Sequence, residues 1–135
     1  MLQSLALIVV GAWLAWCLLN VLLMLAAPYL MGGAGVVTNG IKTVFPQHLR
    51  DRLTEAEQAA ILVHEEGHKA HRHALKNTAR VCVFMPRTAA EAFRQEIQAD
   101  DYAASRGHAK ALASALRKLS DANQDLFRAN RLDGL

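Results

Sequence analysis

An uninterrupted apolar segment near the N-terminus most restricts how this chain can fold. The run Leu5–Ala27 spans 23 residues with no charged side chain and one amide, Asn20. As a helix rising about 1.5 Å per residue it would cover roughly 35 Å, enough to cross the hydrocarbon core of a bilayer. Pro28 then offers a helix end, and Tyr29 suits the membrane interface. The sequence therefore predicts a transmembrane anchor over residues 1–31.

A cleavable signal peptide and a buried helix of a soluble domain are the alternatives to this anchor. A signal peptide usually has a basic start and an apolar core of about 7–15 residues. This segment has no basic side chain before Lys42, and its core is longer. A buried helix would need a large domain around it, which the remaining residues are too few to build. These features favour a retained anchor.

All charged side chains lie downstream of the apolar segment. The 15 basic and 12 acidic residues are interspersed from Lys42 onward. The formal net charge of +3 and the lack of a basic stripe argue against a nucleic-acid partner. The first basic residues after the span are Lys42, Arg50 and Arg52, and the positive-inside rule then places the downstream part in the cytoplasm. The sequence predicts a single-pass membrane protein with one further domain over residues 32–135.

That domain is predicted to begin with a short hairpin and a capped helix. Residues 36–45 are rich in β-branched side chains and contain the turn signal Asn39-Gly40. Thr54 and Glu57 have the spacing of a capping box, which marks a helix start. The hairpin should therefore precede the first helix of the domain.

Two more helices are expected after a non-helical stretch. The capped helix should end near Leu75. The apolar run 81–85, closed by Pro86, is expected to form a strand or part of the core, with contact to the membrane surface as the alternative. Helices are then expected over about 88–106 and 109–127. The expected fold class is mainly α, an α+β arrangement with one transmembrane helix and one short strand or hairpin.

Residues 64–68, His-Glu-Glu-Gly-His, carry the strongest chemical signal in the sequence. Side chains at positions i and i+4 share a helix face, so His64 and His68 project together, as two imidazole ligands of one zinc ion require. Zinc lowers the pKa of a bound water toward about 7, and a neighbouring carboxylate can take its proton. Glu65 stands next to the first ligand and is the expected general base.

A catalytic zinc site needs a third protein ligand and one open position. The candidates are His71, His73, Glu96 and His108. His71 lies on the same short helix as the motif, and three ligands from one helix rarely surround a metal. Glu96 falls on a separate helix that can pack across the first. Asp100, at i+4 from Glu96, faces the same side and can accept the second N–H of a ligating histidine. His71 and His73 are otherwise expected on a solvated face.

The segment Leu53–His68 resembles the active-site helix of membrane-associated gluzincin peptidases. This is the family of the CAAX prenyl protease, the HtpX heat-shock protease and the Oma-type mitochondrial protease. Glu-Ile-Gln-Ala-Asp at residues 96–100, followed by Ala103-Ala104 and Gly107, is similar to the second motif of that family. The resemblance covers roughly residues 36–120.

This resemblance implies one zinc ion per chain, bound by His64, His68 and Glu96. It also implies that Glu65 is the general base and that Asp100 orients a histidine ligand. The implied function is that of a membrane-anchored zinc-dependent endopeptidase, which hydrolyses peptide bonds of a polypeptide substrate through a zinc-bound water activated by glutamate.

The spacing of the two motifs points to a minimal member of that family. Only 27 residues separate His68 from Glu96. By the resemblance, residues 36–45 would supply the strand that holds extended substrate. The alternative function is a non-catalytic membrane protein, acting as a structural or assembly subunit. Its zinc would tie two helices together, with His71 or His108 closing the fourth position.

Overall fold

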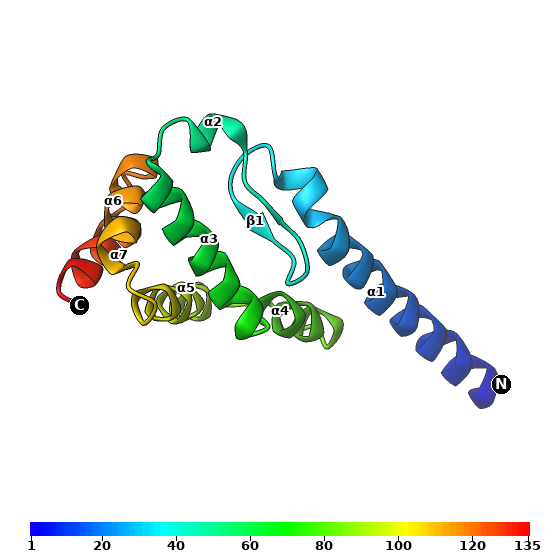
Figure 1. The fold of residues 1–135 in the computed structure, drawn as a ribbon. Helices are drawn as coiled ribbons and strands as arrows, with labels where there is room; N and C mark the ends of the chain where they lie inside the picture. The colour runs from blue at the N-terminus through cyan, green and yellow to red at the C-terminus, as the bar shows by residue number, and fades with distance from the viewer.

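The computed structural model describes residues 1–135, a mainly helical chain whose long N-terminal helix lies apart from the C-terminal helices (Figure 1). The predicted fold class is confirmed, because one short two-stranded antiparallel sheet accompanies the helices. The elements in chain order are α1 (Leu2–Met31), β1 (Val37–Thr38), β2 (Thr43–Val44), α2 (Gln47–Arg50), α3 (Glu55–Ala70), α4 (His73–Cys82), α5 (Ala89–Ala104), α6 (Ala109–Leu119) and α7 (Asn123–Asp133).

Helix α1 extends beyond the apolar run 5–27 at both ends and lies within the predicted anchor of residues 1–31. Pro28 lies inside the helix and does not end it, which corrects the predicted end. A proline removes one backbone hydrogen bond of a helix. Nearby, the carbonyl of Leu25 accepts a hydrogen bond of 3.0 Å from the Asn39 side chain, and Pro28 itself is buried. The apolar 18-residue window of α1 is not buried by the rest of the chain, and the helix is long and apolar enough to cross a membrane.

The hairpin forms where the Asn-Gly pair predicts it. Strand β1 pairs antiparallel with β2. Asn39 Oδ1 accepts hydrogen bonds from the backbone N–H groups of Ile41 at 2.9 Å and Lys42 at 2.8 Å, which closes the turn. Gly40 adopts a φ of 90°, a conformation that favours glycine. The hairpin lies between α1 and α3 (Figure 1).

Helix α3 starts with the predicted capping box. Glu57 Oε2 accepts from the Thr54 N–H at 2.8 Å, and Thr54 Oγ1 accepts from the Glu57 N–H at 3.3 Å. Further along, α3 crosses α5 closely at Gly67. A Cβ atom there would lie 2.9 Å from Ala99 Cα and 3.0 Å from Tyr102 Cβ. Glycine therefore permits the close approach of the two helices.

Helix α3 ends at Ala70, not near Leu75, and a separate helix follows. Arg72 adopts the left-handed conformation, with φ 55° and ψ 38°, and turns the chain. Helix α4 then begins at His73. Because local periodicity continues through this point, the sequence did not reveal the break.

The prediction of a strand or core segment at residues 81–85 is wrong. The first two of these residues end α4, and the other three are exposed. Helix α4 packs on α1 instead of on the core. The indole Nε1 atoms of Trp13 and Trp16 donate hydrogen bonds to the carbonyls of Cys82 at 2.8 Å and Val81 at 3.1 Å.

The helix predicted over 109–127 is two helices, α6 and α7. Ser120 has extended backbone angles, φ −147° and ψ 139°, and interrupts the helix. Its hydroxyl accepts a hydrogen bond of 3.2 Å from the Ala122 N–H, a local contact that competes with helix formation. Helix α7 therefore folds back along α6 and reaches α5.

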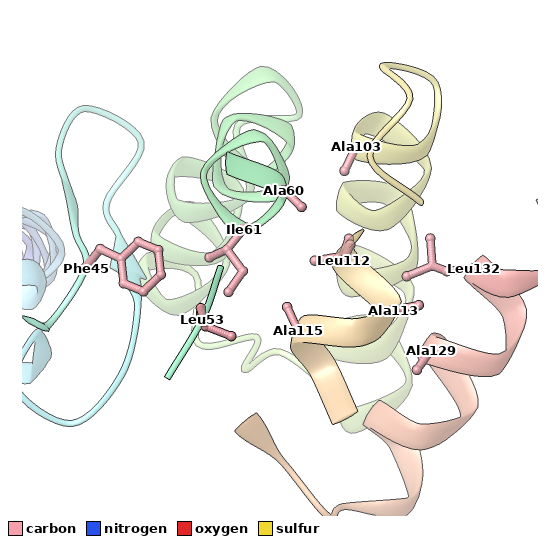
Figure 2. Packing of buried hydrophobic residues seen from close by; sticks show 10 residues of the cluster. All are labelled: Phe45, Leu53, Ala60, Ile61, Ala103, Leu112, Ala113, Ala115, Ala129 and Leu132. Carbon is pink, nitrogen blue, oxygen red and sulfur yellow. The ribbon is translucent and has the colours of Figure 1, made fainter. Parts of the chain in front are cut away.

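A small core rich in alanine holds the helices of the domain together (Figure 2). Half of its members are alanines, whose short side chains let α3, α5, α6 and α7 approach one another. This packing fixes α3 against α5, the two helices that carry the sequence motifs. The core residues are Phe45, Leu53, Ala60, Ile61, Ala103, Leu112, Ala113, Ala115, Ala129 and Leu132.

Candidate metal centre

The crossing of α3 and α5 brings three potential metal ligands together. His64 and His68 lie one turn apart on α3, with their Nε2 atoms 3.1 Å from each other. Glu96 on α5 faces both rings. One of its carboxylate oxygens lies 3.4 Å from His64 Nε2, and the other lies 3.6 Å from His68 Nε2. One donor atom from each of these residues fits within 4.8 Å of the others, so the group could hold a metal ion.

The donor set fits a zinc ion in type and spacing. Tetrahedral zinc takes imidazole nitrogen and carboxylate oxygen at about 2.0–2.2 Å, which separates neighbouring ligand atoms by roughly 3.3–3.6 Å. The separations of 3.1, 3.4 and 3.6 Å are close to that range. Two imidazole nitrogens that face each other and a carboxylate are most stable with a cation between them.

Asp100 lies behind His64, where a residue that orients the imidazole should be. His64 Nδ1 is buried and lies 3.0 Å from Asp100 Oδ1. The alignment falls short of a good hydrogen bond, but no other acceptor satisfies this nitrogen. Burial alone would lower the pKa of His64, whereas Asp100 and Glu96 raise it to about 9. Both carboxylates therefore favour a positive charge at this ring, which a proton or a metal ion can supply.

Arg128 on α7 completes the site and was missed by the sequence analysis. Its Nε and Nη2 atoms each donate a hydrogen bond of 2.8 Å to Asp100. Its Nη1 atom lies 3.3 Å from Glu96 Oε2. Although burial opposes ionisation of Asp100, Arg128 and His64 hold the pKa of this carboxyl below its usual range. No motif marks Arg128, so only the folded structure reveals the contact.

The ring of His68 is held from its other side by a buried histidine. His68 Nδ1 lies 2.8 Å from His73 Nδ1, and His73 Nε2 lies 3.0 Å from Gln98 Oε1. His73 is only 3% exposed, so the prediction of a solvated face is wrong for this residue. The turn at Arg72 brings His73, the first residue of α4, against the end of α3. Burial lowers the pKa of His73 and favours its neutral form.

The other sequence candidates take different places. Glu65 is buried beside the two motif histidines, and burial raises the pKa of its carboxyl above the usual range. His71 is half-buried and stacks on His73, with 5.4 Å between the ring centroids. His108 precedes α6 and does not line the cleft at the three ligands. Neither His71 nor His108 joins the donor group.

The three ligand candidates and Glu65 line one wall of an open cleft of about 290 Å³. The hairpin contributes Val37 and Thr38 to the lining of this cleft, and the remaining lining is largely polar. A cleft of this size admits a short stretch of polypeptide beside the donor atoms. The chemistry that the arrangement can support is hydrolysis, since a buried carboxylate adjoins a potential metal site.

Comparison with protein families agrees with the resemblance seen in the motifs. Residues 33–92 match the model of peptidase family M48, a zinc-dependent family. The match includes the hairpin and both histidines of the motif but ends before Glu96. No curated protein and no solved structure matches the chain. The family match over residues 33–92 supports a relationship of this part of the chain to the M48 family of gluzincin metallopeptidases.

Proposed function

We propose that this protein is a membrane-anchored zinc endopeptidase whose metal is held by His64, His68 and Glu96. The observation that carries the proposal is the convergence of these three side chains beside Glu65 in one open cleft. A purely structural metal site would have no need of a buried carboxylate next to an accessible cleft.

Different residues of the chain have different roles in the proposed hydrolysis. A zinc ion held at this site would act as a Lewis acid toward water and the substrate carbonyl. Glu65 accepts a proton from the attacking water as the water oxygen bonds to the carbonyl carbon of the substrate. The same carboxylic acid then returns the proton to the amine nitrogen as the C–N bond breaks. Asp100 and Arg128 keep the His64 ring in place throughout.

Strand β1 offers a place for an extended substrate. The sheet has only two strands, and β1 pairs with β2 alone. The other edge of β1 pairs with no strand, and Val36, Val37 and Thr38 line the same cleft as the motif histidines. A peptide that adds to this edge would form main-chain hydrogen bonds with limited sequence preference.

The alternative, a non-catalytic zinc protein, needs a fourth protein ligand. Its two candidates, His71 and His108, both lie outside the donor group. His71 stacks on His73. These positions favour an open coordination site, which a catalytic zinc requires.

The membrane part of the proposal rests on α1 and on an exposed apolar patch. The α1 segment of residues 1–31 would be the anchor, and residues 32–135 would form the peptidase domain. Val83, Phe84 and Met85 are 54–70% exposed, and Phe84 stacks on Trp16 of α1 with 6.0 Å between the centroids. Such a patch beside an apolar helix would keep the cleft close to the bilayer. The positive-inside rule favours a cytoplasmic domain.

Two neighbouring glutamates give a matched test of catalysis. Glu65 is buried at the cleft, whereas Glu66 is exposed and does not line the cleft. The full chain, purified in detergent with zinc, is incubated with an unstructured polypeptide such as casein. Glu65→Gln should bind zinc as well as the wild type but lower cleavage at least about 10²-fold. Glu66→Gln should cleave normally. Equal cleavage by wild type and Glu65→Gln would refute the proposal.

A further inference from the structure

We infer that His73 and Gln98 act together to fix the tautomer of His68, so that His68 Nε2 keeps a free lone pair for the metal. These two residues are called the His73–Gln98 relay. His73 is thus a positioning residue, since it touches a metal ligand and not the metal. The inference rests on the proposed function, because it assigns a role toward the same zinc site.

The argument begins with the short contact between two imidazoles. His68 Nδ1 and His73 Nδ1 lie 2.8 Å apart, so one of these nitrogens carries a proton and donates a hydrogen bond that the other nitrogen accepts. On the far side of His73, Nε2 lies 3.0 Å from the Gln98 oxygen. An amide oxygen can only accept, so the His73 proton belongs on Nε2.

The tautomers of both rings follow from that assignment. A neutral His73 with its proton on Nε2 has an unprotonated Nδ1, which accepts a hydrogen bond. The proton shared at the 2.8 Å contact then belongs to His68 Nδ1. A neutral His68 with a proton on Nδ1 has none on Nε2, the atom that faces His64 and Glu96. The relay therefore prepares His68 to bind a metal before any metal arrives.

The two ligand histidines are supported in different ways. Behind His64 stands a carboxylate, Asp100, whose charge Arg128 balances. Behind His68 stands a neutral chain of an imidazole and an amide. The site already holds the carboxylates of Glu65, Glu96 and Asp100, and a neutral support adds no further negative charge. The relay also spans three elements, because His68 lies on α3, His73 on α4 and Gln98 on α5.

The tautomers can be measured directly in the wild-type protein. The full chain is labelled with ¹⁵N, freed of metal and placed in detergent micelles, and long-range ¹H–¹⁵N spectra of the histidine rings are recorded. We expect His68 with its proton on Nδ1 and His73 with its proton on Nε2. If the Gln98 amide were turned around, its nitrogen would donate and both patterns would reverse. A His73 proton on Nδ1 alone would overturn the inference.

Zinc affinity tests the consequence. His73→Leu removes the acceptor and should weaken zinc binding about 10–100-fold in a chelator competition, the usual effect of losing a partner behind a ligand. His73→Asn should restore affinity to within about threefold, because its side-chain oxygen can take the place of Nδ1. His71→Leu is the matched control and should bind as the wild type does. Gln98→Leu should weaken binding less than His73→Leu.

The outcomes separate this inference from the proposed function. If wild type binds no zinc, the proposed function fails, while the tautomer measurement still judges the relay. If wild type and His73→Leu bind zinc equally, the relay is refuted and the proposed function stands. Should His73→Leu fail to fold, Gln98→Leu replaces it, and unchanged zinc affinity together with an unchanged His68 tautomer in that variant would refute the relay.

Discussion

Arg128 on α7 donates hydrogen bonds of 2.8 Å to both carboxylate oxygens of Asp100 on α5. Both side chains are buried, at 6% and 0% exposure. Burial alone would lower the pKa of Arg128, but Asp100 and Glu96 raise it, so the guanidinium stays charged. A residue far from both motifs thus fixes the carboxylate that stands behind His64.

Replacing Arg128 should destabilise the whole domain. In Arg128→Met the buried Asp100 loses its charged partner, and an uncompensated buried charge costs about 3–5 kcal/mol. We expect the free energy of unfolding of the metal-free protein to fall by about that amount, measured by denaturant titration in micelles. Arg131→Met is the control, because Arg131 pairs with the exposed Asp101 and should change stability by less than about 1 kcal/mol. Equal losses in the two variants would contradict the assigned role of Arg128.

A methyl group at Gly67 should disturb both stability and metal binding. Gly67→Ala places its Cβ within 3.1 Å of three atoms of α5, two of them backbone atoms that cannot rotate away. The two helices must move apart, at a cost of about 1–3 kcal/mol. Glu96 then moves away from the histidines, so zinc affinity should also fall.

Gly33→Ala is the control for this substitution. Nothing lies within 4 Å of a Cβ at that position. It should leave stability and zinc affinity within experimental error of the wild type. A Gly67→Ala protein that binds zinc as tightly as Gly33→Ala would show that the close helix crossing is not needed for the site.

Glu57, which lies away from the metal site, should make the stability of the fold depend on pH. Burial would raise the pKa of this carboxyl, but hydrogen bonds from Lys118, Ser114 and Thr54 lower it to about 2. The folded pKa lies below the unfolded value of about 4.3, so the ionised carboxylate stabilises the fold above that pH. This contribution should disappear as the pH falls from about 4.3 to 2.

Comparison of variants isolates that contribution in metal-free protein. Glu57→Gln should be less stable than wild type by about 1–2 kcal/mol at pH 7, since it loses charged hydrogen bonds. The difference should shrink toward zero near pH 2. Glu55→Gln, on the exposed side of the same turn, should show a difference of less than about 0.5 kcal/mol throughout. A difference for Glu57→Gln that does not vary with pH would contradict the ionised pairing.

The proposed anchor makes a separate prediction. Leu14 and Leu18 are 55% and 60% exposed on one face of α1. Arginine at the centre of a span costs about 2.5–3.5 kcal/mol, so Leu14→Arg with Leu18→Arg should release the protein from membranes washed with alkaline carbonate. Ile41→Arg, at the exposed tip of the hairpin, should leave the protein in the membrane fraction. Retention of the double variant would refute a transmembrane α1.

Local signals predicted much of this fold. The capping box at Thr54, the Asn39-Gly40 turn and the i, i+4 spacing of His64 and His68 are each fixed by near neighbours. The break at Arg72 was missed because a left-handed residue that is not glycine leaves little trace in a sequence. The break at Ser120 likewise falls within a continuous helical pattern.

At the site, too, contacts between near neighbours could be predicted from the sequence, whereas contacts between distant elements could not. Glu96 and Asp100 could be proposed because they lie at i and i+4 on one helix. Arg128 and His73 could not, because their contacts with Asp100 and His68 depend on how α7 and α4 pack. Tertiary packing had to be known before either role could be assigned.

Zinc K-edge absorption spectroscopy of the purified full chain, loaded with zinc, tests the central claim most directly. We expect one zinc ion per chain with two imidazole ligands, His64 and His68, and only oxygen donors besides them. Glu96→Gln should lower the zinc affinity without adding an imidazole. A spectrum with three or four imidazoles would indicate a closed structural site. That result, or the absence of zinc binding, would contradict a catalytic zinc at this centre.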